Sequence, residues 1–238
     1  RCNLRCIYCM PSDGVPKLPH EEILRYEELH RVAEIAVGIG VKKIRLTGGE
    51  PLVRKGICDF IARLSRLEGL MDLSLTTNGV YLADKIERLK SAGIRRVNIS
   101  MDSLQKERYR AITGFDCLDR VKEGIRRAEE EGLDPIKINV VLLEGLNDDE
   151  VADFGRLSLD HPYHIRFIEY MPLGGQRKVG PVKHVPEDVV KARLETLGKL
   201  EPVEHRPLDG PAQRFRFVGA PGEVGFISAL SHRFCHAC

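Results

Sequence analysis

The hydrophobic positions of this chain follow two alternating periods. Short runs rich in β-branched residues are separated by longer segments in which apolar residues recur every three to four positions. The predicted strands are Lys43–Thr47, Asp72–Thr77, Arg95–Met101, Ile136–Leu143 and His164–Tyr170. Strands that alternate with helices in this way predict β/α units around a parallel sheet.

The segments between these strands carry apolar faces with helical spacing. The three faces are Leu29, Val32, Ala33, Ala36 and Ile39, then Ile57, Phe60, Ile61 and Leu64, then Leu118, Val121, Ile125 and Ala128. Gly132 follows the third face and is typical of the C′ position of a helix. The run from Asn147 to Glu150 has the composition of a capped helix start. These units predict an α/β fold with an open or incomplete (β/α) barrel.

The pattern changes after about Pro172, where prolines and glycines become more frequent. Gln213–Val218 and Glu223–Ile227 alternate like the strands of an antiparallel hairpin around Ala220-Pro221-Gly222. We therefore expect residues 1–171 to form the barrel and residues 172–238 to form an α+β extension that closes over the barrel mouth.

Composition narrows the class of protein. The 238 residues can bury a substantial core, and a formal net charge of +2 provides no basic field for nucleic acid. We find no apolar run that could span a bilayer and no signal peptide, and the seven cysteines do not resemble a secreted disulfide framework. We expect no nucleic-acid or membrane partner, and a cytoplasmic location, or the mitochondrial matrix if the source is eukaryotic. Both ends lie inside motifs, so we expect a fragment of a longer protein.

The most distinctive motif is the C-x3-C-x2-C triplet of Cys2, Cys6 and Cys9, with Tyr8 directly before the third cysteine. A structural zinc site needs four protein ligands, whereas a [4Fe–4S] cluster held by three thiolates keeps one iron open to another ligand. A redox or zinc loop and three unrelated cysteines are the alternatives. We favour the cluster.

Polar residues gather where the predicted strands end, which is where a (β/α) barrel holds its active site. Gly48 and Gly49 allow close approach of the backbone to a ligand, and Glu50 can accept from an ammonium group. Ser100 shares one face of its strand with Asn98 and Asp102. Thr76-Thr77-Asn78-Gly79 ends the second strand, and Met171 follows the last. The alternative for the glycine segment is an ordinary turn. For Asn98, Ser100 and Asp102 it is a self-satisfied hydrogen-bond network, and for Met171 it is side-chain packing.

Three cations lie on the predicted strands, namely Arg45, Lys137 and Arg166. Charged residues inside a parallel barrel are costly unless they are paired. Three cations near one mouth would suit a polyphosphate. The alternative is a set of salt bridges to Glu50, Glu169 or Asp102.

A second cysteine motif, C-x2-C, ends the chain at Cys235 and Cys238. Taken alone it could be half of a zinc knuckle, a redox pair or two ligands of a second cluster. Cys58 lies on a predicted helix and Cys117 at the start of another, and we interpret both as structural.

Together these segments resemble the radical S-adenosylmethionine (SAM) superfamily and, within it, the molybdenum cofactor biosynthesis protein A family of GTP 3′,8-cyclases. The resemblance runs from Cys2 to Cys238. It rests on C-N-L-R-C-x-Y-C-M-P, K-I-R-L-T-G-G-E-P-L-V-R, L-T-T-N-G, V-N-I-S-M-D-S-L, G-L-N-D-D-E, R-F-I-E-Y-M-P and G-F-I-S-x-x-S-x-x-F-C-x-x-C. The last two are more specific than the superfamily loop. The resemblance implies a partial (β/α)6, TIM-like barrel of the radical SAM type, whose first strand would lie upstream of Arg1.

The same resemblance implies two [4Fe–4S] clusters and SAM as cofactors. Cys2, Cys6 and Cys9 would hold the cluster that cleaves SAM. Cys235, Cys238 and a third cysteine downstream would hold a second cluster, whose open iron would bind the guanine of GTP. The implied SAM contacts are Tyr8, Gly49, Glu50, Ser100 and Met171, and the implied GTP contacts are Arg45, Thr76, Lys137 and Arg166.

The implied reaction is a radical cyclisation. A 5′-deoxyadenosyl radical removes hydrogen from C3′ of the ribose, the sugar radical attacks C8 of guanine, and reduction gives 3′,8-cyclo-7,8-dihydro-GTP. The family implies a flavodoxin-like electron donor, a homodimer and delivery of the product to the next enzyme of the molybdenum cofactor pathway.

Two alternatives stay open at this point. One is a peptide-modifying radical SAM enzyme with an auxiliary cluster, and the other is a non-catalytic iron–sulfur carrier. The family's GTP-contacting arginines, both those that follow the second cysteine motif and one that precedes Arg1, cannot be assigned to residues of this sequence.

Overall fold

The computed structural model describes residues 1–9, 18–171, 183–205 and 209–232 of the chain. Its elements are η1 (His20–Glu22), α1 (Tyr26–Gly38), β1 (Lys43–Leu46), η2 (Pro51–Val53), α2 (Ile57–Leu64), β2 (Asp72–Thr77), α3 (Ile86–Ser91), β3 (Val97–Ser100), α4 (Lys106–Thr113), α5 (Leu118–Glu130), β4 (Ile136–Leu142), η3 (Asp148–Glu150), α6 (Val151–Asp160), β5 (His164–Glu169), α7 (Glu187–Glu195), β6 (Leu200–Pro202), β7 (Gln213–Phe217) and β8 (Glu223–Ile227). In this part of the chain, no helix combines the length and hydrophobicity that crossing a membrane would require.

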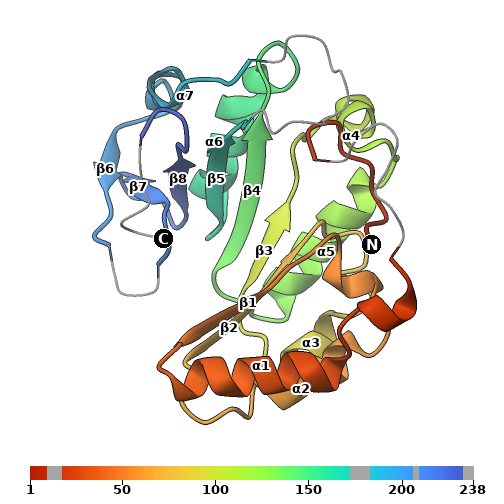
Figure 1. Ribbon diagram of the computed structural model, residues 1–238. Coiled ribbons are helices and arrows are strands. Elements are labelled where there is room, and N and C mark those ends of the chain that lie inside the picture. The colour runs from red at the N-terminus through yellow and green to blue at the C-terminus, as the bar shows by residue number, and fades with distance from the viewer. Residues whose placement is uncertain (10–17, 172–182, 206–208, 233–238) are drawn as a thin grey trace.

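One curved sheet of eight strands organises these elements in the order β1-β2-β3-β4-β5-β8-β7-β6. Strands β1 to β5 pair in parallel, and β8 adds a sixth parallel strand beside β5. Figure 1 shows α1, α2 and α3 beside the β1–β2 end of the sheet and α6 and α7 near its other end. This arrangement confirms the predicted α/β fold and is consistent with a partial TIM-like barrel.

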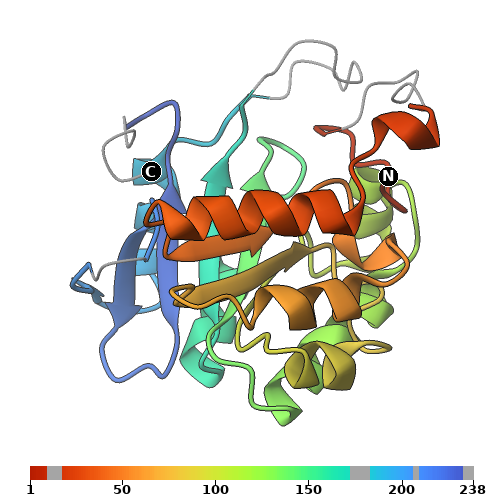
Figure 2. The ribbon, with the colours of Figure 1, turned by 60° about the horizontal axis from the view of Figure 1, so that its bottom comes forward.

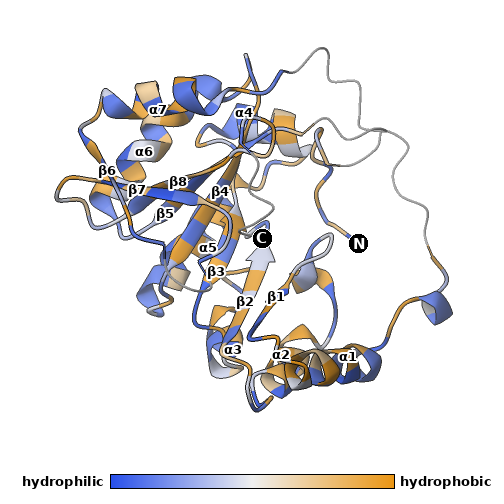
Figure 3. Cartoon of the chain, turned by 60° about the vertical axis from the view of Figure 1, so that its left-hand side comes forward, coloured by the Kyte–Doolittle hydropathy of each residue, from blue (hydrophilic) through white to orange (hydrophobic). Residues whose placement is uncertain are grey.

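Strand β4 shows how the sequence separates the two faces of the sheet. Ile136, Ile138 and Val140 alternate with Lys137 and Asn139, so the apolar and charged side chains point to opposite faces. The apolar residues belong to the buried core between sheet and helices. Figure 3 shows that hydrophilic and hydrophobic residues both occur on the strands. The polar face is therefore the lumen of the partial barrel.

The helices confirm two of the three predicted apolar faces and correct the first. All members of the α2 and α5 faces are buried, and Gly132 takes a positive φ just after α5. Val32 in α1, by contrast, is 59% exposed, and Ile39, directly after α1, is 82% exposed. Helix α1 packs beside α2, as Figure 2 shows, next to β1 at the edge of the described sheet. The sheet therefore covers only part of its apolar stripe.

The C-terminal hairpin forms as predicted and also extends the sheet. Closure of this extension over the barrel mouth stays a prediction. Strand β7 pairs with β8 in antiparallel register, while β8 continues the parallel sheet alongside β5. The pairing gives the open edge of β5 a backbone partner. The proposed boundary between residues 171 and 172 stays a prediction.

Candidate active site

The first three cysteines lie in one loop at the carboxyl end of the parallel strands. Backbone hydrogen bonds from Arg5 N to Thr113 O (2.9 Å) and from Ile7 N to Ile112 O (3.0 Å) attach this loop to α4. Leu4 is 3% exposed and anchors the loop in the core. Cys2 and Cys6 are half-buried, whereas Cys9 is exposed.

The thiols of this loop interact with one another. Burial, followed by the charge of Asp102 and the other two thiols, raises the pKa of Cys6, and burial with Cys2 raises that of Cys9. The free thiols of Cys6 and Cys9 are therefore protonated at neutral pH. Because metals bind the thiolate, loading the site with metal must release protons. Among the described residues, no three His, Cys, Asp or Glu side chains converge on a single metal ion.

Asp102 fixes the position of Tyr8 within the cysteine loop. The Tyr8 hydroxyl donates to Asp102 Oδ2 (2.7 Å), and Val141 N donates to Asp102 Oδ1 (2.8 Å). Burial raises the pKa of Asp102 to about 6, and both hydrogen bonds oppose that rise. Asn147 Nδ2 donates to the Asp102 carbonyl (2.7 Å) and its Oδ1 accepts from Leu143 N, so its side chain does not cap η3. Helix α6 nevertheless begins at Val151, directly after the run that the sequence predicts as a helix start.

The Gly48–Pro51 turn packs directly against the start of the chain. Glu50 N donates to Arg1 O (2.8 Å), and a Cβ on Gly49 would lie 2.4 Å from the same oxygen. Position 49 thus requires glycine because the backbone of the chain's own cysteine loop lies directly against it. A contact of Gly49 with SAM stays a prediction.

Glu50 ties this turn to the end of β2. Its carboxylate accepts from Leu52 N (2.9 Å), Thr77 Oγ1 (2.7 Å) and Asn78 N (2.7 Å), while the side chain is almost fully buried. Asn78 Nδ2 in turn donates to Asn3 Oδ1 (2.8 Å) and lies 3.8 Å from Cys2 Sγ. Glu50 therefore positions the cysteine loop, and its contact with a ligand ammonium stays a prediction.

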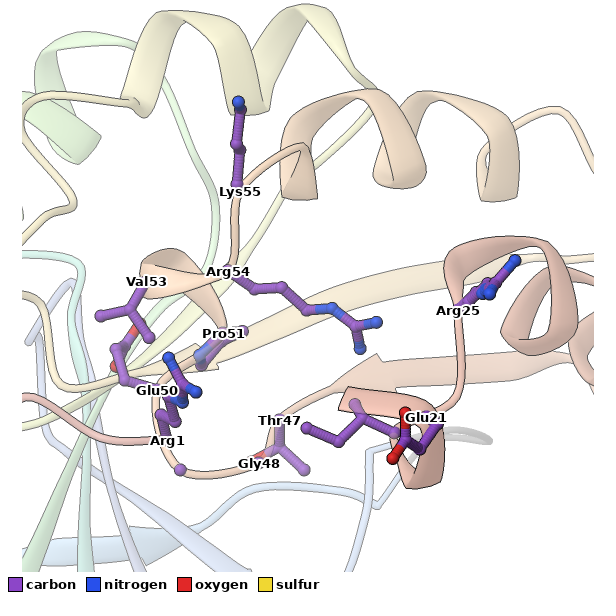
Figure 4. A pocket seen from close by; sticks show the side chains of 12 residues that line it. Arg1, Glu21, Arg25, Thr47, Gly48, Glu50, Pro51, Val53, Arg54 and Lys55 are labelled. Atoms are coloured by element: carbon purple, nitrogen blue, oxygen red, sulfur yellow. The ribbon is translucent and has the colours of Figure 1, made fainter. Parts of the chain in front are cut away.

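A cavity of about 790 Å³ adjoins this turn on the side of η1. Its lining residues are Arg1, Glu21, Ile23, Arg25, Thr47, Gly48, Gly49, Glu50, Pro51, Val53, Arg54 and Lys55. Figure 4 shows the Arg54 side chain extending across the cavity while Lys55 points away. The Arg54 guanidinium donates to Leu24 O (2.6 Å) and stacks over Tyr26, so it is already engaged within the chain.

The lumen is lined by polar rows that the strand register brings together. One row runs from Thr76 through Asn98 to Lys137, and the next runs from Ser100 through Asn139 to Arg166. The buried atoms Ser74 Oγ, Asn98 Oδ1 and Asn139 Oδ1 have no hydrogen-bond partner among the described residues. Buried polar atoms normally have partners, so a polar ligand in the lumen would satisfy these atoms.

Two lumen cations, Lys137 and Arg166, are buried and form no hydrogen bond or ion pair within the described part of the chain, although Asp209 attracts both. They are 6% and 4% exposed. Burial, with Arg166 as the next cause, lowers the pKa of Lys137 to about 7. Burial, with Arg45 as the next cause, lowers that of Arg166 to about 10. An unpaired buried charge is costly, so an anion would stabilise both residues.

Neighbouring cations, in contrast, are paired. Arg96 and Lys43 share Asp72, with Lys43 Nζ at 3.8 Å. Arg214 forms two hydrogen bonds with Glu223, at 2.8 and 2.9 Å. The carboxylates that the sequence offered as partners of Lys137 and Arg166 are each bound elsewhere: Glu50 as described, Asp102 to Tyr8 and Glu169 to the backbone of Leu230 and Ser231. Within the described residues, therefore, neither cation forms a salt bridge with any of the three carboxylates that the sequence offered.

The remaining predicted residues occupy less enclosed positions. Arg45 is exposed on β1, and Met171 is 42% exposed directly after β5. Cys235 and Cys238 lie outside the described residues. Sequence reasoning missed Ser74 and Asn139, although the alternation that identified Lys137 also places Asn139 on the lumen face.

Cys58 should be dispensable for metal binding. It is 5% exposed within α2, among core residues. We expect Cys58→Ser to leave the iron bound per chain after anaerobic reconstitution unchanged. Chemical iron analysis checks this, with Cys9→Ser as the matched change inside the triplet. A fall in iron for Cys58→Ser would contradict the structural interpretation.

Comparisons of the sequence with known proteins identify the family of this chain. The model of the radical SAM superfamily matches residues 1–157, and that of Molybdenum Cofactor Synthesis C matches residues 163–238. A "GTP 3′,8-cyclase" of Moorella thermoacetica is 50% identical over all of this chain and 73% of the relative. One of Geobacter sulfurreducens is 51% identical over the same shares.

Solved structures show the same fold at lower identity. Streptococcus suis SuiB has a TM-score of 0.66 and 18% identity, over 82% of this chain and 43% of SuiB. SuiB bound to S-adenosylmethionine has a TM-score of 0.64 and 16% identity, over 82% of this chain and 44% of SuiB. At these identities the likeness concerns the fold alone.

Proposed function

Because the chain belongs to the radical SAM superfamily and to its GTP 3′,8-cyclase family, we propose that it converts GTP into 3′,8-cyclo-7,8-dihydro-GTP for molybdenum cofactor biosynthesis. The observation that carries the proposal is a lumen beside a three-cysteine loop, with buried cations and polar atoms that find no hydrogen-bond partner among the described residues. The match of the C-terminal part to the cofactor-synthesis model favours this function over peptide modification or iron–sulfur carriage.

Membership of the radical SAM superfamily supports a [4Fe–4S] cluster that binds SAM on the cysteine loop. Cys2, Cys6 and Cys9 would hold the cluster, which on reduction supplies the one-electron cleavage of SAM. The chain's own residues position that loop: α4 through two backbone hydrogen bonds, Asp102 through Tyr8, and Glu50 through the backbone that pairs with Arg1. We propose that Tyr8, Gly49, Ser100 and Met171 contact SAM.

GTP would lie further into the lumen. We assign Lys137, Arg166 and Arg45 to its phosphates, because charge-assisted contacts would satisfy the two cations that form no ion pair within the described residues. Thr76 lies in the same row as Lys137. Residues on the row of Ser100, Asn139 and Arg166 would hold the ribose close to SAM, because that row joins the two proposed sites.

The other parts of the proposal rest on family membership. We propose that Cys235 and Cys238, together with a further cysteine, hold a second [4Fe–4S] cluster that binds guanine. A flavodoxin-like electron donor, a homodimer, a cytoplasmic location and delivery of the product to the next enzyme of the pathway complete the proposal.

An anaerobic assay tests the function. The reconstituted full-length protein is incubated with dithionite, SAM and GTP, and 5′-deoxyadenosine and cyclised nucleotide are measured by mass spectrometry. We expect both products. 5′-Deoxyadenosine without cyclised nucleotide would leave a radical SAM enzyme with a different substrate, and the absence of both would contradict the proposal.

A further inference from the structure

Residues 145–150, the G-L-N-D-D-E motif of the sequence, have no part in the proposed contacts with SAM or GTP. They lie between β4 and α6 and include η3. Two of their polar side chains are nonetheless fully enclosed, because Asn147 is 0% exposed and Glu150 is 1% exposed. Buried polar groups are costly unless they have hydrogen-bond partners, so the partners of these two side chains indicate what the motif holds.

Asn147 holds Asp102 through a closed set of hydrogen bonds. Its Nδ2 donates to Asp102 O (2.7 Å) and to Val141 O (2.9 Å), and its Oδ1 accepts from Leu143 N (2.8 Å). Val141 N donates in turn to Asp102 Oδ1 (2.8 Å). The backbone and the carboxylate of Asp102 are therefore both fixed to the end of β4.

Asp102 connects this arrangement to the cysteine loop. Its second carboxylate oxygen, Oδ2, accepts from the Tyr8 hydroxyl (2.7 Å). Tyr8 lies between Cys6 and Cys9 in the sequence, and Asp102 follows Ser100, the last residue of β3, by two positions. Asp102 therefore fixes Tyr8 relative to the end of β3, and both Tyr8 and Ser100 are proposed contacts of SAM.

Glu150 supports the same segment from the other end of the motif. Its Oε1 accepts from Ser103 Oγ (2.7 Å) and from Arg108 Nη1 (2.6 Å), and its Oε2 accepts from Leu104 N (2.7 Å). Arg108 lies on α4, the helix whose last turn binds the backbone of the cysteine loop. The motif thus binds both supports of that loop, namely the segment after β3 and helix α4.

We propose that Asn147 is a positioning residue for SAM binding, because it holds Asp102 where the carboxylate fixes Tyr8 of the cysteine loop. The inference rests on the proposed function, which assigns SAM to this loop. Asn147 acts on the loop through Asp102, so its contribution to SAM binding should disappear once the Tyr8 hydroxyl is removed. A residue that only stabilises the fold would contribute equally with and without that hydroxyl.

The test is a double-mutant cycle in the reconstituted full-length protein. Asn147→Ala removes the three hydrogen bonds of the amide, and Tyr8→Phe removes only the hydroxyl. Anaerobic isothermal titration calorimetry gives the affinities of the wild type, both single variants and the double variant for SAM and for GTP. Hydrogen exchange of the peptide that contains the cysteine loop, iron per chain and the melting temperature are measured for each protein.

Two further variants complete the design. Ser158→Ala is the matched control, because the buried Ser158 hydroxyl donates to Gly155 O (2.7 Å) within α6 and its loss removes a buried hydrogen bond elsewhere in the fold. Asn147→Ser, which keeps a smaller polar side chain, takes the place of Asn147→Ala in the cycle if the alanine variant does not fold.

We expect each single variant to bind SAM about tenfold more weakly than the wild type, which is the loss expected for one hydrogen bond to a carboxylate. The double variant should also lose about tenfold rather than a hundredfold, because both changes break the same connection. Both single variants should exchange faster in the cysteine loop and keep the wild-type iron content and affinity for GTP. Ser158→Ala should keep the affinity for SAM and the exchange of the loop, even if its melting temperature falls.

Other outcomes would overturn the inference. An unchanged affinity for SAM in the Asn147 variant, or a loss of about a hundredfold in the double variant, would show that Asn147 does not act through Tyr8. Equal losses of SAM and GTP binding, or a loss of iron, would assign Asn147 to the general stability of the barrel. Failure of the proposed function is distinguishable, because the wild type would then bind SAM with the same coupling between the two residues but form no cyclised nucleotide.

Discussion

Replacing Cys6 by alanine should abolish SAM cleavage. Only two of the three thiolates would remain in the loop, and a [4Fe–4S] cluster with an open iron needs all three. We expect 5′-deoxyadenosine formation under dithionite to fall below detection, at least about a thousandfold below wild type, because the reaction requires electron transfer from the cluster to SAM. Mass spectrometry of the anaerobic reaction measures this directly.

Cys117→Ala provides the matched control for this change. Cys117 is a free, half-buried cysteine at the start of α5, outside the cysteine loop. It should keep wild-type iron content and 5′-deoxyadenosine formation. If Cys6→Ala continued to form 5′-deoxyadenosine, the assignment of the triplet to the SAM-cleaving cluster would be wrong.

Sequence alone predicted the elements that carry a strong local pattern. Strand β2 forms over the predicted residues, and the buried faces of α2 and α5 coincide with those expected. Each of these patterns arises because one side of the element is buried. Apolar residues then recur every 2 residues in a strand and every 3.6 residues in a helix. Lys137 was found in the same way, as a cation on a strand whose alternate residues are apolar.

Features that depend on strand pairing could not be read from the sequence. The hairpin pattern predicted β7 and β8, but nothing local shows that β8 also pairs with β5. The exposure of Val32 arises because α1 lies at the sheet edge, which is a property of strand order. Tertiary contacts decide both.

The same limit applies to the polar residues of the site. A carboxylate such as Glu169 can pair with a cation or with backbone N–H groups, and sequence does not distinguish these partners. In the structure the backbone donors lie 61 and 62 positions away. Asn147 likewise is a residue type that often caps helices, but its side chain donates to the Asp102 carbonyl instead. These partners became visible only once the strands were in register.

Replacing Lys137 by alanine should weaken GTP binding and leave SAM binding unchanged. Lys137 is buried, forms no ion pair with a residue that the structure describes, and lies in the row of Thr76 and Asn98. A hydrogen bond to a charged group contributes about 1.5–3 kcal/mol, and each 1.4 kcal/mol corresponds to a tenfold change in affinity. We therefore expect the Kd for GTP to rise about 10- to 100-fold. Isothermal titration calorimetry of each ligand measures both affinities.

The effect of this substitution should also depend on pH, because burial lowers the pKa of Lys137 to about 7. The free protein loses the Lys137 charge as the pH rises through 7, and only the protonated form attracts the phosphates. From pH 6 to pH 8 the protonated fraction falls about tenfold. The ratio of wild-type to variant affinity for GTP should fall by about that factor, and GTP binding at pH 8 should take up a proton.

Comparing each affinity with that of Lys137→Ala separates this effect from ionisation of GTP itself, since both proteins meet the same nucleotide at each pH. Lys90→Ala serves as the surface control, because Lys90 forms an exposed pair with Glu131 and lies away from the lumen. A surface pair of this kind contributes little, so its affinities should match wild type. Equal losses of SAM and GTP binding in Lys137→Ala would instead assign the lysine to the structure of the barrel. A ratio that does not change with pH would mean that Lys137 stays charged without its ligand.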